Sequence, residues 1–391
     1  MNQQFDFSDI EPYSDKEFKE NMTRLVTEPG FEHAVKYVMP DVDFQEFTKQ
    51  LCEVPDNETF QREVMLPFLH MLALKTTSGL TIGGLENISK EGSYTFMSNH
   101  RDIVLDASFL NYCFLTNGIP TSEVAIGNNL LIMDWITDLV KLNKSFIVKR
   151  NLKLVKALEA AHQLSAYIHY AILDKHQSVW IAQREGRAKD SNDRTQEALV
   201  KMLALEGGGS TIENLKAINI VPVSISYEYD PNDYLKATEF LLRRLDPDFK
   251  KSQHDDLLSM ETGLLQPKGH VHFELGKCID SELESLSPDI EKNELLKRIC
   301  GLIDSNIHLG CKIYPINYIA YDRLHKTSRF EDCYTRAQAD DFLEYIEKQL
   351  DKVRLHDVSE LDREYMREMM FVMYSNPLKN KLMAAGLECH I

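Results

Sequence analysis

Between residues 80 and 275, short runs rich in β-branched and aromatic residues alternate with longer stretches that carry apolar side chains at helical spacing. Each short run predicts a strand, and each longer stretch predicts a helix. The expected strands are 80–82, 94–98, 124–126, 145–148, 178–182, 218–226 and 270–275. The expected helices among them are 107–115, 131–142, 152–173, 195–205 and 234–244. Because parallel strands need a crossover of helical length, the alternation predicts βαβ units and a largely parallel sheet.

The chain on either side of this region has helical patterns. Residues 17–74 have helical spacing interrupted at Pro29, Pro40 and Pro55, and 288–304 and 337–374 also have helical character. We therefore expect a helical N-terminal region (1–78), an α/β domain (79–280) and a helical C-terminal region (281–391). The predicted fold class is α/β, with a largely parallel mixed sheet flanked by helices.

Charge and hydropathy exclude several classes of function. The chain has 44 Lys and Arg residues against 61 Asp and Glu residues, a net charge of -17, which disfavours nucleic acid as a partner. The longest nearly apolar stretch, 64–74, is far shorter than the roughly 20 residues that span a bilayer. The acidic start, 1–20, has no pattern of a secretory signal, so we expect a cytoplasmic protein.

One segment, 94–106, carries most of the functional information. Its apolar run stops at Asn99 and His100, and two carboxylates follow at Asp102 and Asp106. A carboxylate near one imidazole nitrogen makes the other nitrogen a stronger base. The segment thus predicts a histidine base at a strand end, with either aspartate as its partner.

Cations follow two of the expected strands. Lys149 and Arg150 come directly after 145–148, and Arg101 follows His100. In a chain this acidic, a basic cluster at a strand end predicts a pocket for phosphate or for an acidic carrier.

Two further strands end in features that suit a binding pocket. Arg184, Glu185, Gly186 and Arg187 follow the strand 178–182, and Gly186 allows a tight turn that brings an arginine to an oxyanion. Pro222 interrupts the last long apolar run and predicts a sheet edge, a bulge or a strand end, because proline cannot donate to a ladder.

Taken in order, these four segments resemble the four-block signature of the glycerolipid acyltransferase superfamily. The resemblance covers about residues 80–280. It is nearest to the glycerol-3-phosphate acyltransferase branch, to whose first two blocks "HRDIVLDASFLNY" and "SFIVKR" are similar. A helical region ahead of the α/β domain, with no membrane span, is also similar to the soluble plastid members of that branch.

The resemblance implies a role for each block. His100 would take the proton from an acceptor hydroxyl and Asp106 would orient it. Arg150 and Arg187 would hold an acceptor phosphate, and Glu185–Gly186 would shape the pocket.

This sequence departs from the family pattern at three places. Five residues separate His100 from Asp106, where the family has four, so Asp102 stays a rival partner. Arg187 follows Gly186 directly, which leaves Arg184 as an alternative phosphate ligand. Lys144 stands where the second block commonly has glycine.

We therefore expect an O-acyltransferase that moves a fatty acyl chain from acyl-CoA or acyl carrier protein to glycerol-3-phosphate or a lysophospholipid. Neither a metal nor a separate cofactor is expected, since His270 and His272 lack a third ligand at a suitable spacing. An acidic carrier protein would dock on the basic stretch from Lys141 to Lys156.

Two alternatives to this function stay open from the sequence. In the first alternative, the acceptor is a non-glycerol amino-acid lipid. In the second, the chain is a non-catalytic lipid-binding protein of the same fold. We also expect peripheral contact with the cytoplasmic face of a membrane through 64–74 or 130–142, although both stretches equally fit buried core helices.

Overall fold

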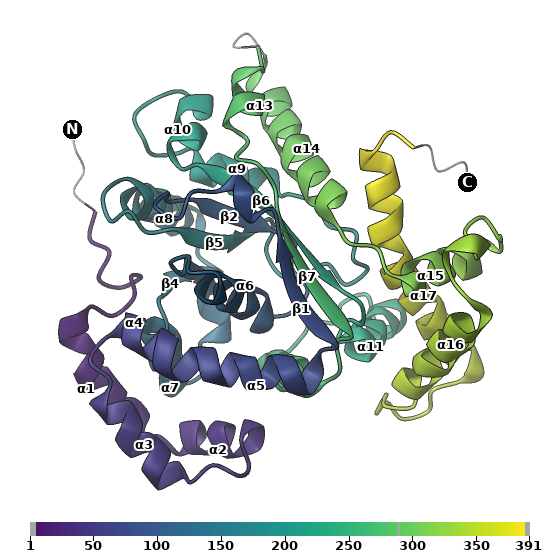
Figure 1. The fold of residues 1–391 in the computed structure, drawn as a ribbon. Helices are drawn as coiled ribbons and strands as arrows, with labels where there is room; N and C mark the ends of the chain where they lie inside the picture. The colour runs from purple at the N-terminus through teal and green to yellow at the C-terminus, as the bar shows by residue number, and fades with distance from the viewer. Residues whose placement is uncertain (1–4, 288–289, 388–391) are drawn as a thin grey trace.

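The computed structural model describes residues 5–287 and 290–387. Within these residues, seven strands form one sheet in the order β1-β7-β6-β2-β5-β3-β4 (Figure 1). The strands are β1 (Gly79–Gly83), β2 (Thr95–Ser98), β3 (Glu123–Gly127), β4 (Ser145–Val148), β5 (Val179–Ala182), β6 (Ile220–Tyr227) and β7 (His270–Leu275). Neighbouring strands run parallel except β6 and β7. The predicted α/β class with a largely parallel mixed sheet is confirmed.

Helices cover both faces of the sheet, which explains why the central strands β2 and β6 are buried along their whole length. Successive side chains such as Phe96 and Met97 on β2 enter opposite cores. One core packs the sheet against α8 (Leu154–Leu173), α9 (Glu197–Leu203) and α14 (Lys292–Gly310). The other packs it against α5 (Leu66–Thr76) and α6 (Leu105–Thr116).

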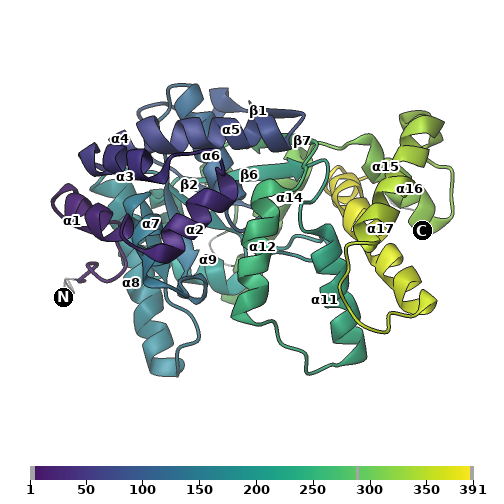
Figure 2. The ribbon, with the colours of Figure 1, turned by 90° about the horizontal axis from the view of Figure 1, so that it is seen from below.

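Two helical clusters lie at opposite ends of the sheet (Figures 1 and 2). The N-terminal cluster joins α1 (Asp15–Leu25), α2 (Pro29–Val38), α3 (Phe44–Glu53), α4 (Asn57–Thr59) and η1 (Phe60–Met65) to α7 (Asp134–Leu142). The C-terminal cluster joins α15 (Pro315–His325), α16 (Arg336–Leu350) and α17 (Glu360–Ala384) to α11 (Asp233–Leu245). The remaining elements are α10 (Thr211–Ala217), α12 (Gln253–Leu265), α13 (Asp280–Glu284), η2 (Leu85–Asn87), η3 (Asn128–Leu130) and η4 (Glu331–Cys333). The division at residues 78 and 280 stays a prediction.

The predicted helical stretch 337–374 is two helices. Asp357 has a φ of 57°, a left-handed conformation that ends right-handed helix. The hydroxyl of Ser359 then accepts the N–H of Asp362 at 3.2 Å, which caps the start of α17. The helical spacing of apolar residues continues through the segment between α16 and α17, so this spacing does not reveal where the first helix ends.

The helix predicted to begin at residue 288 starts later. Pro288 lies outside the described residues, and α14 begins at Lys292. The Glu291 carboxylate accepts the N–H groups of Asn293 (2.9 Å) and Glu294 (3.1 Å) and so caps the helix.

Pro222 lies inside a central strand, so the prediction of a sheet edge is wrong. It pairs with Met97 of β2, and its carbonyl accepts the Gly276 N–H at 2.8 Å on the opposite side, towards β7. The ladder between β6 and β7 begins only at Val223. The missing N–H of Pro222 therefore faces the point where that ladder stops, and no bond of the β2 ladder is lost.

Residues 64–74, the most apolar stretch, fall within η1 and α5. Across the residues that the structure describes, none of the helices has both the length and the apolar character to cross a bilayer.

Candidate active site

The site begins where β2 ends, and a side chain extends the sheet there. Asn99 Nδ2 donates to the Ile225 carbonyl at 2.9 Å, and the Ile225 N–H donates to Asn99 Oδ1 at 2.7 Å. The side chain thus makes the two bonds that a strand residue would make towards β6. Fixed in this way, the backbone turns out of the sheet at His100.

His100 is paired with Asp106. Its Nδ1 lies 2.8 Å from Asp106 Oδ2, and that oxygen also accepts the N–H groups of Arg101 (2.6 Å) and Asp102 (3.1 Å). Asp106 is fully buried in the first turn of α6, where a carboxylate suits the positive end of the helix. With Nδ1 donating to an anion, Nε2 is the nitrogen that can accept a proton.

Asp102 has a different place. Its Oδ1 accepts the N–H groups of Val104 (2.9 Å) and Leu105 (2.8 Å), and Asn232 Nδ2 donates to its Oδ2 at 3.2 Å. Burial, and then the charge of Asp106, raise the pKa of Asp102. Asp102 therefore caps the start of α6, and the five-residue spacing still brings Asp106 to His100.

Two aromatic residues enclose this pair. Trp180 of β5 meets the imidazole edge-on, with ring centroids 5.8 Å apart, and its Nε1 donates to Ser98 Oγ at 3.0 Å. Tyr227, at the end of β6, is buried beside Asp106; burial and then that carboxylate raise its pKa well above the usual value. The sequence patterns identified neither residue, because each is an ordinary strand aromatic.

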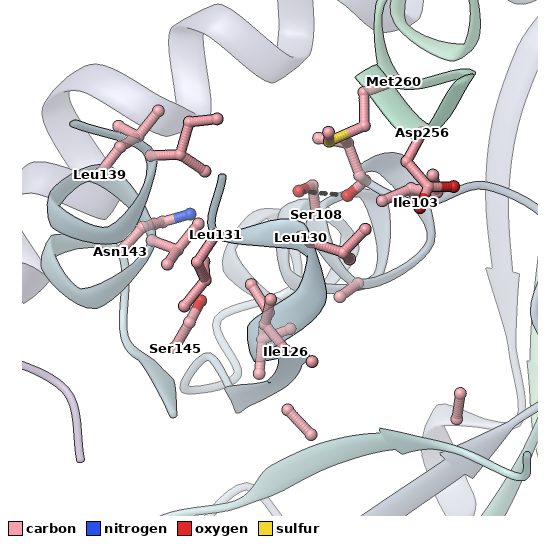
Figure 3. A pocket seen from close by; sticks show the side chains of 18 of the residues that line it. Ile103, Ser108, Ile126, Leu130, Leu131, Leu139, Asn143, Ser145, Asp256 and Met260 are labelled. Atoms are coloured by element: carbon pink, nitrogen blue, oxygen red, sulfur yellow. Dashed lines mark hydrogen bonds between the residues drawn. The ribbon is translucent and has the colours of Figure 1, made fainter. Parts of the chain in front are cut away.

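His100 and Trp180 line a cavity of about 2290 Å³. The wall is mainly apolar, and much of it comes from the N-terminal helices, η3 and α7, including Val38, Met65, Phe68, Leu131, Ile136 and Leu139. In Figure 3, Leu131 and Leu139 lie on one side of this space and Ile103 and Met260 on the other. The stretches 64–74 and 130–142, predicted to contact a membrane, thus contribute side chains to this cavity.

Cations line another part of the same cavity. Arg150, Arg184 and Arg187 all contribute, together with Glu185 and Gly186. Arg187 is buried, and no group among the described residues accepts a hydrogen bond from its Nη1. A buried guanidinium nitrogen without a partner is costly, so it fits a site for an anion.

Local backbone geometry positions two of these groups. Gly186 has a φ of 67°, which glycine adopts without strain and which turns the chain between Glu185 and Arg187. Arg150 lies across Gly127, where an added Cβ would be 2.7 Å from its Nε, and its Nη1 lies 3.4 Å from Glu185 Oε1.

Three residues predicted to bind substrate lie elsewhere or are engaged. Arg101 is buried and pairs with Asp193, with 2.6 Å between Nη2 and Oδ2, on a side that does not line the large cavity. Pro222 is buried in β6 and does not line it either. Lys149 does line the cavity, but it is held in an ion pair with Asp9.

Sequence reasoning missed several further cations of the cavity wall, among them Lys189 and Lys251. Burial, and then the charge of Arg187, lower the pKa of Lys189 to about 7, although Glu239 lies 3.3 Å away. Lys189 follows Arg187 by two residues, so its closeness in the sequence to a predicted phosphate ligand was a signal that could have identified it. Lys251 precedes α12, and no pattern in its surroundings points to the site.

One comparison with known proteins identifies a family for part of the chain. Residues 79–226 match the family model described as "Acyltransferase". Among solved structures, the chain is similar to the 1-acyl-sn-glycerophosphate (LPA) acyltransferase PlsC from Thermotoga maritima, with 13% identity and a TM-score of 0.35. That likeness covers 73% of this chain and 95% of the other. No curated protein sequence matches the chain. The family match over residues 79–226 bears out the acyltransferase resemblance predicted from the four blocks, which lie within that segment.

Proposed function

We propose that this protein transfers a fatty acyl chain from a thioester, acyl-CoA or acyl carrier protein, to a hydroxyl of glycerol-3-phosphate or a lysophospholipid. The observation that carries this proposal is the shared cavity. It holds the His100 base, a long apolar wall and a group of cations together. These three features match the reacting hydroxyl, the acyl chain and the phosphate of such a pair of substrates.

The proposed chemistry is general-base catalysis. Nε2 of His100 takes the proton of the acceptor hydroxyl while the hydroxyl oxygen attacks the thioester carbon. The new C–O bond forms, the C–S bond breaks, and the leaving thiolate takes the proton from the imidazolium. Asp106 stabilises that imidazolium and keeps Nδ1 protonated, so that Nε2 is the reacting nitrogen.

The dimensions of the cavity support a long acyl substrate. At about 2290 Å³ it exceeds the roughly 300–1,000 Å³ of typical small-molecule sites. Its apolar wall joins residues of α2, η1 and α5 to residues of α7, so the N-terminal helices contribute to acyl binding in this proposal.

The acceptor phosphate is assigned to Arg150, Arg187 and Lys189. Arg187 supplies a buried guanidinium nitrogen with no acceptor in the described part of the chain. A phosphate placed there would also relieve the mutual repulsion of Arg187 and Lys189, which contributes to lowering the pKa of Lys189.

The test of this proposal is release of free thiol from palmitoyl-CoA and palmitoyl carrier protein by the purified chain. Glycerol-3-phosphate, lysophosphatidate and a hydroxy-amino-acid lipid are added separately as acceptors. We expect release that depends on a phosphate acceptor and falls about 10²–10⁴-fold in His100→Ala, because a positioned base contributes about that factor.

The matched control is His356→Ala, since His356 is exposed between α16 and α17. This variant should release thiol at the wild-type rate. Full activity in His100→Ala would contradict the base. Release only with the amino-acid lipid would favour the non-glycerol acceptor, and no release with any pair would favour a non-catalytic lipid-binding protein.

The two aspartates should respond differently to amide substitution. Asp106→Asn removes the anion that holds Nδ1 protonated, so we expect kcat to fall about 10²–10⁴-fold. Asp102→Asn keeps an oxygen for the N–H groups of Val104 and Leu105, and we expect a loss of less than about tenfold. Steady-state kinetics measures both, and a larger loss in Asp102→Asn would contradict the assignment.

Gly127→Ala tests the position of Arg150. Gly127 has a φ of −67°, which alanine adopts readily, but the added methyl displaces the guanidinium. We expect KM for the phosphate acceptor to rise about 10-fold or more, because hydrogen bonds to charged groups are worth about 1.5–3 kcal/mol. Gly301→Ala, where an added Cβ meets nothing within 4 Å, is the control. Equal KM values in both variants would remove Arg150 from acceptor binding.

The lowered pKa of Lys189 predicts that binding of a phosphate acceptor depends on pH. Its pKa of about 7 means that the amine is charged below that pH and neutral above it. The free enzyme therefore loses a cation as pH rises, and kcat/KM for a phosphate acceptor should decline through about pH 7. Lys189→Arg keeps the charge and should move this decline to higher pH. An unchanged profile in the variant would assign the decline to another group.

A further inference from the structure

The first turns of α8 protrude from the fold with apolar side chains in solvent. Every residue from 151 to 159 is exposed. Leu154 is 91% exposed, Val155 72%, Leu158 57% and Leu152 36%. In Figure 2, α8 extends outward from the body of the fold. Four large aliphatic side chains together on a protruding helix start are unusual, since clustered exposed apolar side chains mark interaction sites.

These side chains form one face with cations beside it. Leu154 and Val155 lie one turn before Leu158, so all three share a side of the helix. Lys153 and Lys156 are interleaved with them, and Glu159 is the one acid in 151–159. This segment of a chain with net charge -17 is therefore locally basic and apolar.

The same helix start is continuous with the large cavity. Leu152, Ala157, Ala160, Ala161 and Leu164 line that cavity, so the exposed turns stand beside it. An aliphatic substrate moving between a bilayer and the cavity would pass along apolar surface here.

We infer that residues 152–158 insert into the surface of an anionic lipid bilayer and set the cavity beside it, an inference that rests on the proposed function. Aliphatic side chains that enter the acyl boundary while flanking lysines meet lipid phosphates are the chemistry of an interfacial helix. Neither predicted contact stretch offers a comparable free face. Trp135, for example, packs against Phe31 and Gly30.

An acidic carrier protein fits this surface less well. Lys141 is buried, Lys144 lies 3.6 Å from Glu58, and Lys149 pairs with Asp9. Most of the basic stretch predicted for carrier docking is therefore already engaged, and the exposed part, with Lys153 and Lys156, is dominated by aliphatic side chains.

Cosedimentation of the full chain with vesicles tests the inference without substrates or turnover. Vesicles of phosphatidylcholine with phosphatidylglycerol are compared with vesicles of phosphatidylcholine alone. The variant combines Leu154→Ser, Val155→Ser and Leu158→Ser, and we expect its partition coefficient to fall at least about tenfold. Lys153→Glu with Lys156→Glu should abolish the preference for the anionic vesicles.

The control is Leu361→Ser, because Leu361 is 74% exposed on α17, in the C-terminal helical cluster. It should bind like the wild type. All three substituted side chains are exposed, so we expect the triple variant to fold, and circular dichroism checks that it does. Wild-type binding by a folded triple variant would overturn the inference.

Two other outcomes would also overturn it. One is an equal loss in Leu361→Ser, which would mean unspecific binding. The other is no vesicle binding by the wild type together with a raised KM for palmitoyl carrier protein in the triple variant, which would make the surface a carrier site. Because binding is measured without substrates, failure of this inference and failure of the proposed acyl transfer remain separate results.

Discussion

The contact between His100 and Asp106 depends on a buried charge that the turn before α6 must satisfy. Asp106 has no access to water, and an uncompensated buried carboxylate costs several kcal/mol. Two backbone N–H groups and the imidazole compensate this charge, because all three donate hydrogen bonds to a single oxygen, Asp106 Oδ2. The turn is therefore held in one conformation, and the ring is oriented by the same bonds that stabilise the anion.

The rest of the fold keeps this turn in place and builds around it. The Asn99 side chain fixes the end of β2 against β6, and Asp102 caps α6 while contacting Asn232 at the start of α11. Gly263 of α12 lies so close to Asp102 that a Cβ there would collide with the carboxylate. The N-terminal helices then close the apolar side of the cavity, and the loops after β4 and β5 bring the cations.

Much of this architecture could be predicted from the sequence. Short runs rich in β-branched and aromatic residues mark the strands, so all seven were located, and the carboxyl ends of three of them brought His100, Arg150 and Arg187 to one cavity. Other features depend on details that periodicity does not carry. The choice of Asp106 over Asp102 follows from hydrogen bonds within one turn, and Arg101 is held by Asp193, 92 positions further along the chain. Pro222 was misplaced because its missing donor matters only on one side of the strand.

The pairing of His100 with Asp106 is tested most directly by the tautomer of the neutral His100 ring, which nitrogen-15 NMR of protein labelled at histidine reports. A spectrum of His100→Gln assigns the signals by difference. We predict that Nδ1 carries the proton, held by Asp106, and that Nε2 gives the signal of an unprotonated nitrogen. A proton on Nε2 would contradict it, because the nitrogen facing the substrate could then accept no proton from an acceptor hydroxyl.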